Sequence, residues 1–307
     1  MRAIRRTKKI EGTSVPGIIN NGGHYFYIHV DVYEDGMSNC WELVDQDGLA
    51  DKINSGWLAP AVPSGEQLSI HGLGAYKVVK AEWDYSKQTY LKHFVDVISS
   101  LNPELTNLYK VTEREKQQQE ARKITSSPAA TDFYVMQELF YQTVEGRGFF
   151  LFMKYAGAIY LVNLIVYKDG RVAVYNLPEE AEYRIEEIGT LFADGTLFTE
   201  FSADSVIRIQ NLGEVTLAKP LYSSEIPEKY KELVELHKKL NGQKTAAEEC
   251  RAAYYTYLEY PGEYTRGKLK EKYELVPEHE RMYLGDMDNR DRDYRRIIYT
   301  PDVKREV

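Results

Sequence analysis

The stretch Val32-Tyr33-Glu34-Asp35-Gly36 returns in altered form as Val166-Tyr167-Lys168-Asp169-Gly170. The residues around it repeat at a constant offset of 134 positions, which becomes 139 farther along the chain. The aligned pairs include Ile28 with Val162, Gly56 with Gly195, Gly74 with Gly213 and Leu101 with Leu240. A shared register over this length, with apolar positions matching apolar positions, indicates a tandem duplication with a five-residue insertion between Tyr175 and Gly195.

Each copy shows the same order of strand and helix signals. Asp35-Gly36 is typical of a hairpin turn, because Asp-Gly supplies the positive φ that such turns need. Leu49 and Ile53 have helical spacing before a Gly stop, and a longer apolar helical face ends at Leu101. Residues 1–23 are rich in turn-formers and are expected to precede the first strand. The pattern predicts an α+β fold made of two β-β-α-β-β-α modules.

The chain therefore divides into four expected regions. We expect a first module over residues 1–103, a charged helix or linker over 104–130, and a second module over 131–242. Residues 243–307 have no counterpart in the first copy. They are expected to form a helical appendage that begins at the capping box of Thr245 and Glu248 and ends in a tail dense in Asp and Arg.

The composition of the chain argues against several classes of protein. A net charge of −8 argues against general binding of nucleic acids, which requires clustered Lys and Arg. The two cysteines suggest no disulfide framework, and no apolar run approaches the roughly 18 residues of a membrane span. We expect a cytoplasmic protein without a membrane partner. The 25 tyrosines suit either a binding surface or, more simply, strands and core edges.

No cofactor or metal site is expected. The acidic stretch from Asp286 to Asp293 departs from the EF-hand ligand pattern, and its Arg290 and Arg292 would repel a cation. We expect instead a loop of internal ion pairs, with Arg295 and Arg296 as further partners of the acids. The sequence lacks a dinucleotide fingerprint, a Walker A loop, a nucleophile elbow and the His-Glu-x-x-His motif. We therefore predict no catalytic residue.

Differences between the copies suggest where binding occurs. Positions that stay aromatic in both copies, Trp41/Tyr175 and Trp83/Tyr222, are expected to serve packing. Positions that differ are free of that constraint, and three of them carry aromatic or imidazole groups in the first copy. These candidate binding residues are Trp57 (Thr196 in the second copy), His71 (Gln210) and His24 (Ala158). Trp57 is the main candidate because tryptophan is a common interface anchor.

Two functions of different classes remain open. The first is a non-catalytic protein that binds or inhibits another protein through a duplicated module, which the lack of catalytic motifs favours. The second is a hydrolase or transferase with a site between the copies. That site would combine acids with a histidine, and the residues considered are Glu42, Asp45 and Asp47 with His24 or His71. A deep pocket of convergent polar groups would favour the enzyme, and a broad aromatic patch the binding protein.

Overall fold

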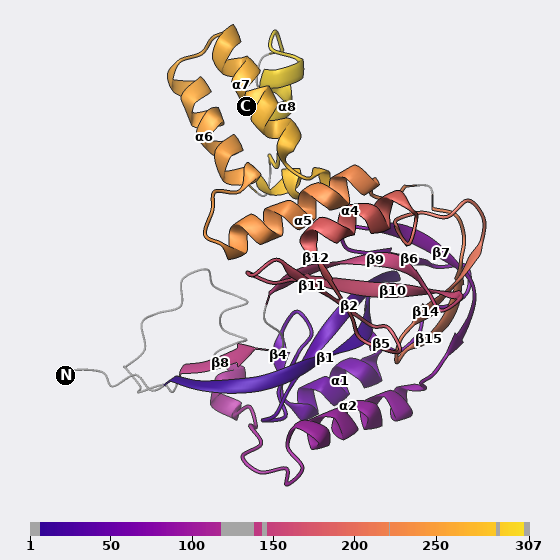
Figure 1. Cartoon of the computed structure of the whole chain (residues 1–307). Coiled ribbons are helices and arrows are strands. Elements are labelled where there is room, and N and C mark those ends of the chain that lie inside the picture. The colour runs from indigo at the N-terminus through magenta and orange to yellow at the C-terminus, as the bar shows by residue number, and fades with distance from the viewer. Residues whose placement is uncertain (1–6, 118–137, 143–145, 221, 287–288, 304–307) are drawn as a thin grey trace, which may run out of the picture. The chain divides into compact units, whose positions relative to one another are not determined.

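The computed structural model describes residues 7–117, 138–142, 146–220, 222–286 and 289–303, and it has a mixed α+β fold (Figure 1). The chain forms two compact units. Unit 1 comprises Met1–Ile70, Ala75–Glu145 and Ala203–Lys219, and unit 2 comprises His71–Gly74, Gly146–Ser202 and Pro220–Val307. The expected break at Ser126-Ser127-Pro128 and the expected second-module start near Thr131 lie outside the described residues.

Unit 1 is built on a long antiparallel hairpin. Residues 12–21 of β1 (Thr7–Asn21) pair with the whole of β2 (His24–Tyr33). Helices α1 (Gln46–Ser55) and α2 (Lys87–Leu101) pack together beside these strands (Figure 1). Strand β6 (Gln67–Ile70) runs parallel to β2. The other strands of this unit are β3 (Ser38–Asn39), β4 (Leu43–Val44), β5 (Leu58–Ala59), β7 (Gly74–Trp83, which belongs to unit 1 from Ala75 on), β8 (Glu138–Gln142), β14 (Ser205–Ile209) and β15 (Gly213–Leu217).

The expectation that residues 1–23 only lead into the first strand is wrong, because β1 begins at Thr7. Pro16 and Gly17 are two of the turn-forming residues on which that expectation was based, and both lie inside this strand. Glu34 N donates to Glu11 O, so the hydrogen-bonded pairs of the ladder fall on the odd positions of β1. The nitrogen of Pro16 therefore points away from β2, where no N–H is needed.

Unit 2 combines an antiparallel sheet with helices. Its strands are β9 (Arg147–Tyr155), β10 (Ala158–Val166), β11 (Arg171–Tyr175), β12 (Ala181–Arg184) and β13 (Leu197–Phe198). Helix α4 (Ile185–Ala193) packs on β12 and β13, and α5 (Ile226–Leu240) packs on β9 and β10. The long apolar stretches of β9 and β10 form the buried faces of these strands, as the sequence predicts.

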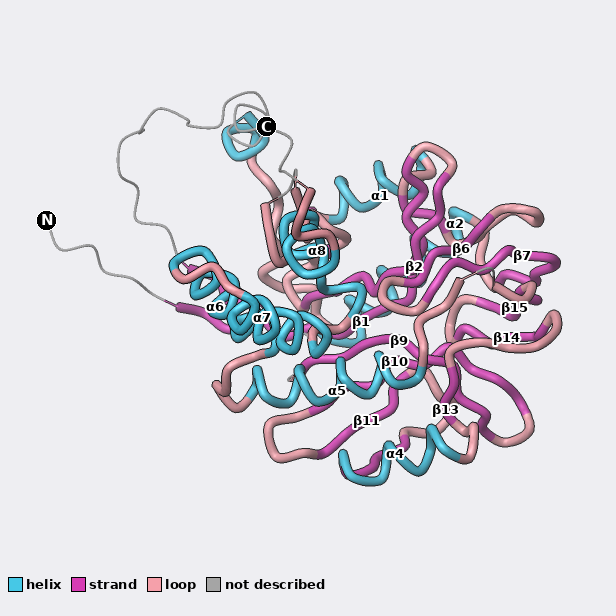
Figure 2. Tube along the Cα trace, turned by 90° about the horizontal axis from the view of Figure 1, so that it is seen from above, coloured by secondary structure: helices cyan, strands magenta, loops and turns pink. Residues whose placement is uncertain are grey.

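The C-terminal part of unit 2 is helical, as expected. Helices α6 (Ala246–Glu259) and α7 (Glu263–Leu275) pack side by side, and α8 (Arg292–Tyr299) packs against α7 (Figure 2). A short 3-10 helix, η1 (Glu278–Tyr283), connects α7 to the loop before α8. Thr245 and Glu248 form the predicted capping box at the start of α6. Tyr273 and Tyr294 are buried in the core of this helical group, together with Cys250 and Leu269.

The local geometry recurs between the two halves of the sequence. Gly36 N donates to Tyr33 O at 3.0 Å, and Gly170 N donates to Tyr167 O at 3.0 Å. Strand registers correspond as well. The pairs are Ile18 with Tyr27 and Phe152 with Leu161 in the hairpins, and Ile19 with Leu58 and Met153 with Leu197 at the short strands.

Candidate functional site

Trp57 is held by elements on both sides of it. Helix α1 ends at Gly56, whose φ of 81° and N–H bond to Ile53 O turn the chain out of the helix. The carbonyl of Trp57 then accepts a 2.8 Å hydrogen bond from Asn20 N in β1. The indole is half-buried, and Lys52 Nζ lies 4.1 Å from its ring centroid, within cation–π range.

Trp41 adds a second indole to this surface. Its side chain is 64% exposed, and its ring meets that of Trp57 edge-on at 6.2 Å and 77°. The ring centroid of Phe26 lies 6.1 Å from that of Trp41. We call Phe26, Trp41 and Trp57 the Trp cluster. The prediction that Trp41 serves internal packing is wrong, and so is the prediction for Tyr222, which is 62% exposed.

The backbone at Trp41 is unusual. Its φ is 71°, a left-handed backbone conformation that residues other than Gly, Asn and Asp rarely adopt. The turn is closed by Cys40 N, which donates to Glu42 O at 3.2 Å. The chain therefore holds a large aromatic side chain in solvent at a position where glycine would fit with less strain.

His24 occupies the start of β2, opposite Asn21 in the hairpin. It is exposed, and no ring contact among the described residues joins it to the Trp cluster. His71 belongs to unit 2 rather than to unit 1. The three residues predicted as one binding surface are thus distributed over two compact units, and only Trp57 belongs to the aromatic group.

His71 faces a buried polar group that the sequence did not reveal. Its ring lies 5.8 Å from that of His279, at 88°. His279 Nε2 is 3.4 Å from Glu232 Oε1, and the other oxygen of Glu232 accepts from Lys229 Nζ at 2.7 Å. We call His71, Lys229, Glu232 and His279 the Lys229 cluster. Gly72 closes over it, since a Cβ there would lie 3.3 Å from Lys229 Nζ.

Burial controls the electrostatics of this cluster. The Lys229 side chain is completely buried, which lowers its pKa against the opposing effect of Glu232. Burial alone would raise the pKa of Glu232, but His279 and Lys229 together outweigh it and hold that pKa below its usual range. Lys229 Nζ also lies 4.5 Å from the ring centroid of Phe149. The pKa of His71 is lowered, first by desolvation and then by the charge of His279.

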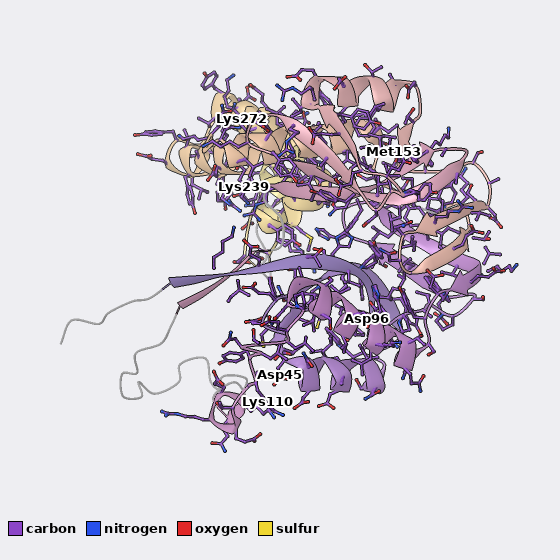
Figure 3. All side chains as sticks on the ribbon, turned by 60° about the horizontal axis from the view of Figure 1, so that its bottom comes forward. Asp45, Asp96, Lys110, Met153, Lys239 and Lys272 are labelled. Carbon is purple, nitrogen blue, oxygen red and sulfur yellow. The ribbon has the colours of Figure 1, made fainter. Side chains whose placement is uncertain are left out.

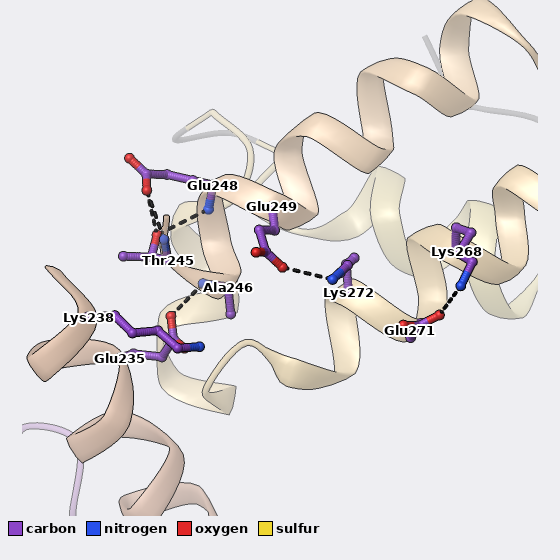
Figure 4. A network of polar contacts seen from close by, with 9 residues as sticks. All are labelled: Glu235, Lys238, Thr245, Ala246, Glu248, Glu249, Lys268, Glu271 and Lys272. Atoms are coloured by element: carbon purple, nitrogen blue, oxygen red, sulfur yellow. Dashed lines mark hydrogen bonds and ion pairs between the residues drawn. The ribbon is translucent and has the colours of Figure 1, made fainter. Parts of the chain in front are cut away.

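A pocket of about 690 Å³ opens beside this cluster, within unit 2. His71, Glu232 and His279 line it, and further lining residues are Arg147, Glu235, Lys239, Thr245, Glu248 and Glu280. One wall is fixed by polar contacts between α5 and α6 (Figure 4). There Glu235 accepts from Ala246 N and, at 2.7 Å, from Lys238 Nζ.

The acids considered for an enzyme site between the copies have other roles. Asp45 caps α1 by accepting from Gly48 N at 2.9 Å. Asp47 pairs with Lys110 at 2.8 Å, close to Asp45 (Figure 3), and Glu42 pairs with Lys52 at 3.1 Å. These contacts explain the three acids as local structure.

The acidic stretch after η1 is also occupied by internal contacts. Asp286 accepts from Asn289 N at 2.7 Å, Asp291 accepts from the Tyr273 hydroxyl at 2.6 Å, and Asp293 lies 3.6 Å from Arg296. Asp288 lies outside the described residues. In the part of the chain that the structure describes, no group of three or more His, Cys, Asp or Glu residues is arranged to hold a metal ion.

Two family models match the chain. The one described as "Domain of unknown function (DUF7638)" matches residues 1–105 and 134–244, which is more than half of the sequence. The chain belongs to the DUF7638 family. A second model, "Domain of unknown function (DUF7639)", matches residues 245–306. Neither the curated proteins nor the solved structures contain a match.

The pocket in unit 2 combines both matched regions. Glu235 and Lys239 come from the DUF7638 part, whereas Thr245 and Glu248 come from the region matched by DUF7639.

Within the described ranges, no helix has the length and apolar character needed to cross a membrane.

The structure adds Trp41, Lys229, Glu232 and His279 to the candidate residues. Lys229 and Glu232 are three apart on a helix, a spacing that could have signalled their ion pair but not its burial. His279 joins them from a distant part of the sequence, and no local pattern identifies that contact.

Proposed function

We propose that this member of the DUF7638 family binds another protein through the Trp cluster, without catalysing a reaction. The observation that carries the proposal is Trp41, a 64% exposed indole in contact with Trp57. Exposed aromatic side chains that gather in one place are typical of interaction sites. The partner is expected to present apolar or aromatic side chains, because the two indoles offer mainly ring surface.

The backbone at Trp41 supports the same proposal. A left-handed conformation costs about 1–2 kcal/mol for a residue with a Cβ, and the exposed indole recovers little of this by burial. Strain that folding does not need is often found at functional sites. The half-buried Trp57, with Lys52 over its ring, gives Trp41 a rigid neighbour.

We further infer that the binding unit descends from a duplicated module. The recurring hairpin turns at Gly36 and Gly170 support this, as do the corresponding strand registers. Only the first copy carries two indoles in this position, which would assign recognition to it. We expect the partner in the cytoplasm, where the buried thiols of Cys40 and Cys250 would stay reduced.

Affinity capture with matched variants tests the proposal. The wild-type protein, Trp41→Ala and Trp57→Ala would be used as baits in parallel, with Tyr264→Ala as the control. Tyr264 is 77% exposed and lies on α7, outside the Trp cluster. A partner retained by wild type and control should bind each Trp variant about 30-fold more weakly, the effect of losing a hot spot worth about 2 kcal/mol.

Two further measurements make the result decisive. Thermal unfolding of Trp41→Ala should match wild type, so that lost binding cannot be attributed to lost folding. A photo-crosslinking residue at position 41 should label the captured partner directly. A partner that binds both Trp variants with wild-type affinity would contradict the proposal.

A further inference from the structure

The acidic side chains of the unit 2 pocket are mostly engaged within the protein. Glu232 contacts Lys229 and His279, at 2.7 and 3.4 Å. Glu235 accepts from the start of α6, and Glu248 accepts from Thr245 N at 2.9 Å in the capping box. These carboxylates are therefore already neutralised or hydrogen-bonded, and they have little need of a cation from outside.

The basic side chains of the same pocket differ from the acidic ones in how many internal contacts they make. Among the described residues, Arg147, Lys239 and Lys244 make no side-chain hydrogen bond or ion pair at contact distance, although all three line the pocket. Arg251 differs, because its guanidinium donates to the carbonyls of Tyr283 and Leu284. The pocket thus presents three available cations.

Glu280 is the one lining carboxyl with no hydrogen-bond partner within the described ranges. Burial raises its pKa, with the nearby charge of Glu232 acting in the same direction and His279 against it. A carboxyl shifted in this way is protonated more easily than usual, and a protonated carboxyl can donate a hydrogen bond to an anion.

We propose that this pocket binds a small molecule carrying an oxyanion group, a phosphate or a carboxylate, through Arg147 and Lys239. Arginine and lysine are the side chains that proteins use for such groups. The volume of about 690 Å³ fits a small-molecule ligand. Beside the buried Lys229–Glu232 pair lie the rings of His71 and His279, and these rings would contact the rest of the ligand.

Titration calorimetry with the full chain tests this, using inorganic phosphate and succinate as separate probes. Potassium chloride at matched ionic strength controls for general screening. We expect saturable binding of at least one probe, weakened about ten-fold or more by Arg147→Gln and by Lys239→Gln. Lys270→Gln is the matched control, because it removes the same charge from α7 outside the pocket.

The identity of the effective probe distinguishes the two ligand classes. As a second readout, the ring signals of His71 in NMR spectra should shift with the effective probe and stay unchanged in chloride. This readout needs no variant and so does not depend on the variants folding. Binding that persists at wild-type strength in Arg147→Gln and Lys239→Gln, or no response to either probe by both methods, would overturn the proposal.

Discussion

Lys229 Nζ donates a 2.7 Å hydrogen bond to Glu232 Oε2, in a place where the lysine side chain is completely buried. Two ions removed from water are stable only when each compensates the other, and removal of one partner leaves an uncompensated buried charge. We expect Lys229→Met to destabilise unit 2 by about 3–5 kcal/mol. The double variant Lys229→Met, Glu232→Leu should recover part of this loss. Chemical denaturation measures both, and a single variant as stable as wild type would show that the pair is unimportant.

The strain at Trp41 can be measured by comparing two substitutions that both remove the indole. Trp41→Gly should be more stable than Trp41→Ala by about 1 kcal/mol, because glycine adopts the observed φ of 71° without a Cβ clash. Urea unfolding midpoints give the difference. Equal stability of the two variants would mean that this backbone carries no strain in solution.

Tyr90 connects α2 to β1 by a buried hydrogen bond. Its hydroxyl donates to Pro16 O at 2.7 Å, and the whole side chain is inaccessible to solvent. Tyr90→Phe should cost about 1–2 kcal/mol, because it leaves the carbonyl of Pro16 without its partner. Tyr264→Phe, on an exposed side chain, should change the unfolding free energy by less than about 0.5 kcal/mol.

Both cysteines should resist modification in the folded protein. Cys40 and Cys250 are fully buried, and burial raises both thiol pKa values, that of Cys250 to about 12. The thiolate is the reactive form, so alkylation at pH 8 should be slow until denaturant is added. Mass spectrometry then counts the labelled sites. Rapid labelling of the native protein at either position would contradict the burial of these thiols.

Removing the charge of Glu280 and removing the charge of Glu248 should change the folding stability at pH 7 in opposite directions. The folded-state pKa of Glu280 is raised, so its contribution to stability is present below its unfolded pKa and is lost as pH rises through the folded value. Glu280→Gln should therefore increase stability at pH 7, by less than about 1 kcal/mol because the group is partly solvated. The difference from wild type should vanish below about pH 4.

The pKa of Glu248 is lowered instead, by its hydrogen bonds to Thr245. Its contribution is present above its unfolded pKa and is lost as pH falls through the folded value. Glu248→Gln should thus decrease stability at pH 7 and have no effect in acid. Thermal unfolding at several pH values checks both variants, and the same sign for both at pH 7 would refute this assignment.

Much of the local structure could be predicted from the sequence. Asp35-Gly36 forms the expected turn, Gly56 ends α1 in a left-handed conformation, and Thr245 starts α6. These features depend on residues close together in the chain, whose φ preferences and side-chain bonds act locally. The mixed α+β class follows from the same signals. Pro16 is the exception, because its effect on β1 depends on which side of the strand meets β2.

The candidate sites depended on contacts that the sequence does not encode locally. Trp41 and Lys229 both reverse the usual preference, since the indole is exposed and the ammonium group is buried. Lys229 is buried where it contacts Glu232 on the same helix and Phe149 from β9, and His279 from η1 contacts Glu232 in turn. The sequence determined the turns, caps and apolar faces because these are properties of neighbouring residues. Only the tertiary structure decided which polar groups lose water, because desolvation depends on every segment that packs around them.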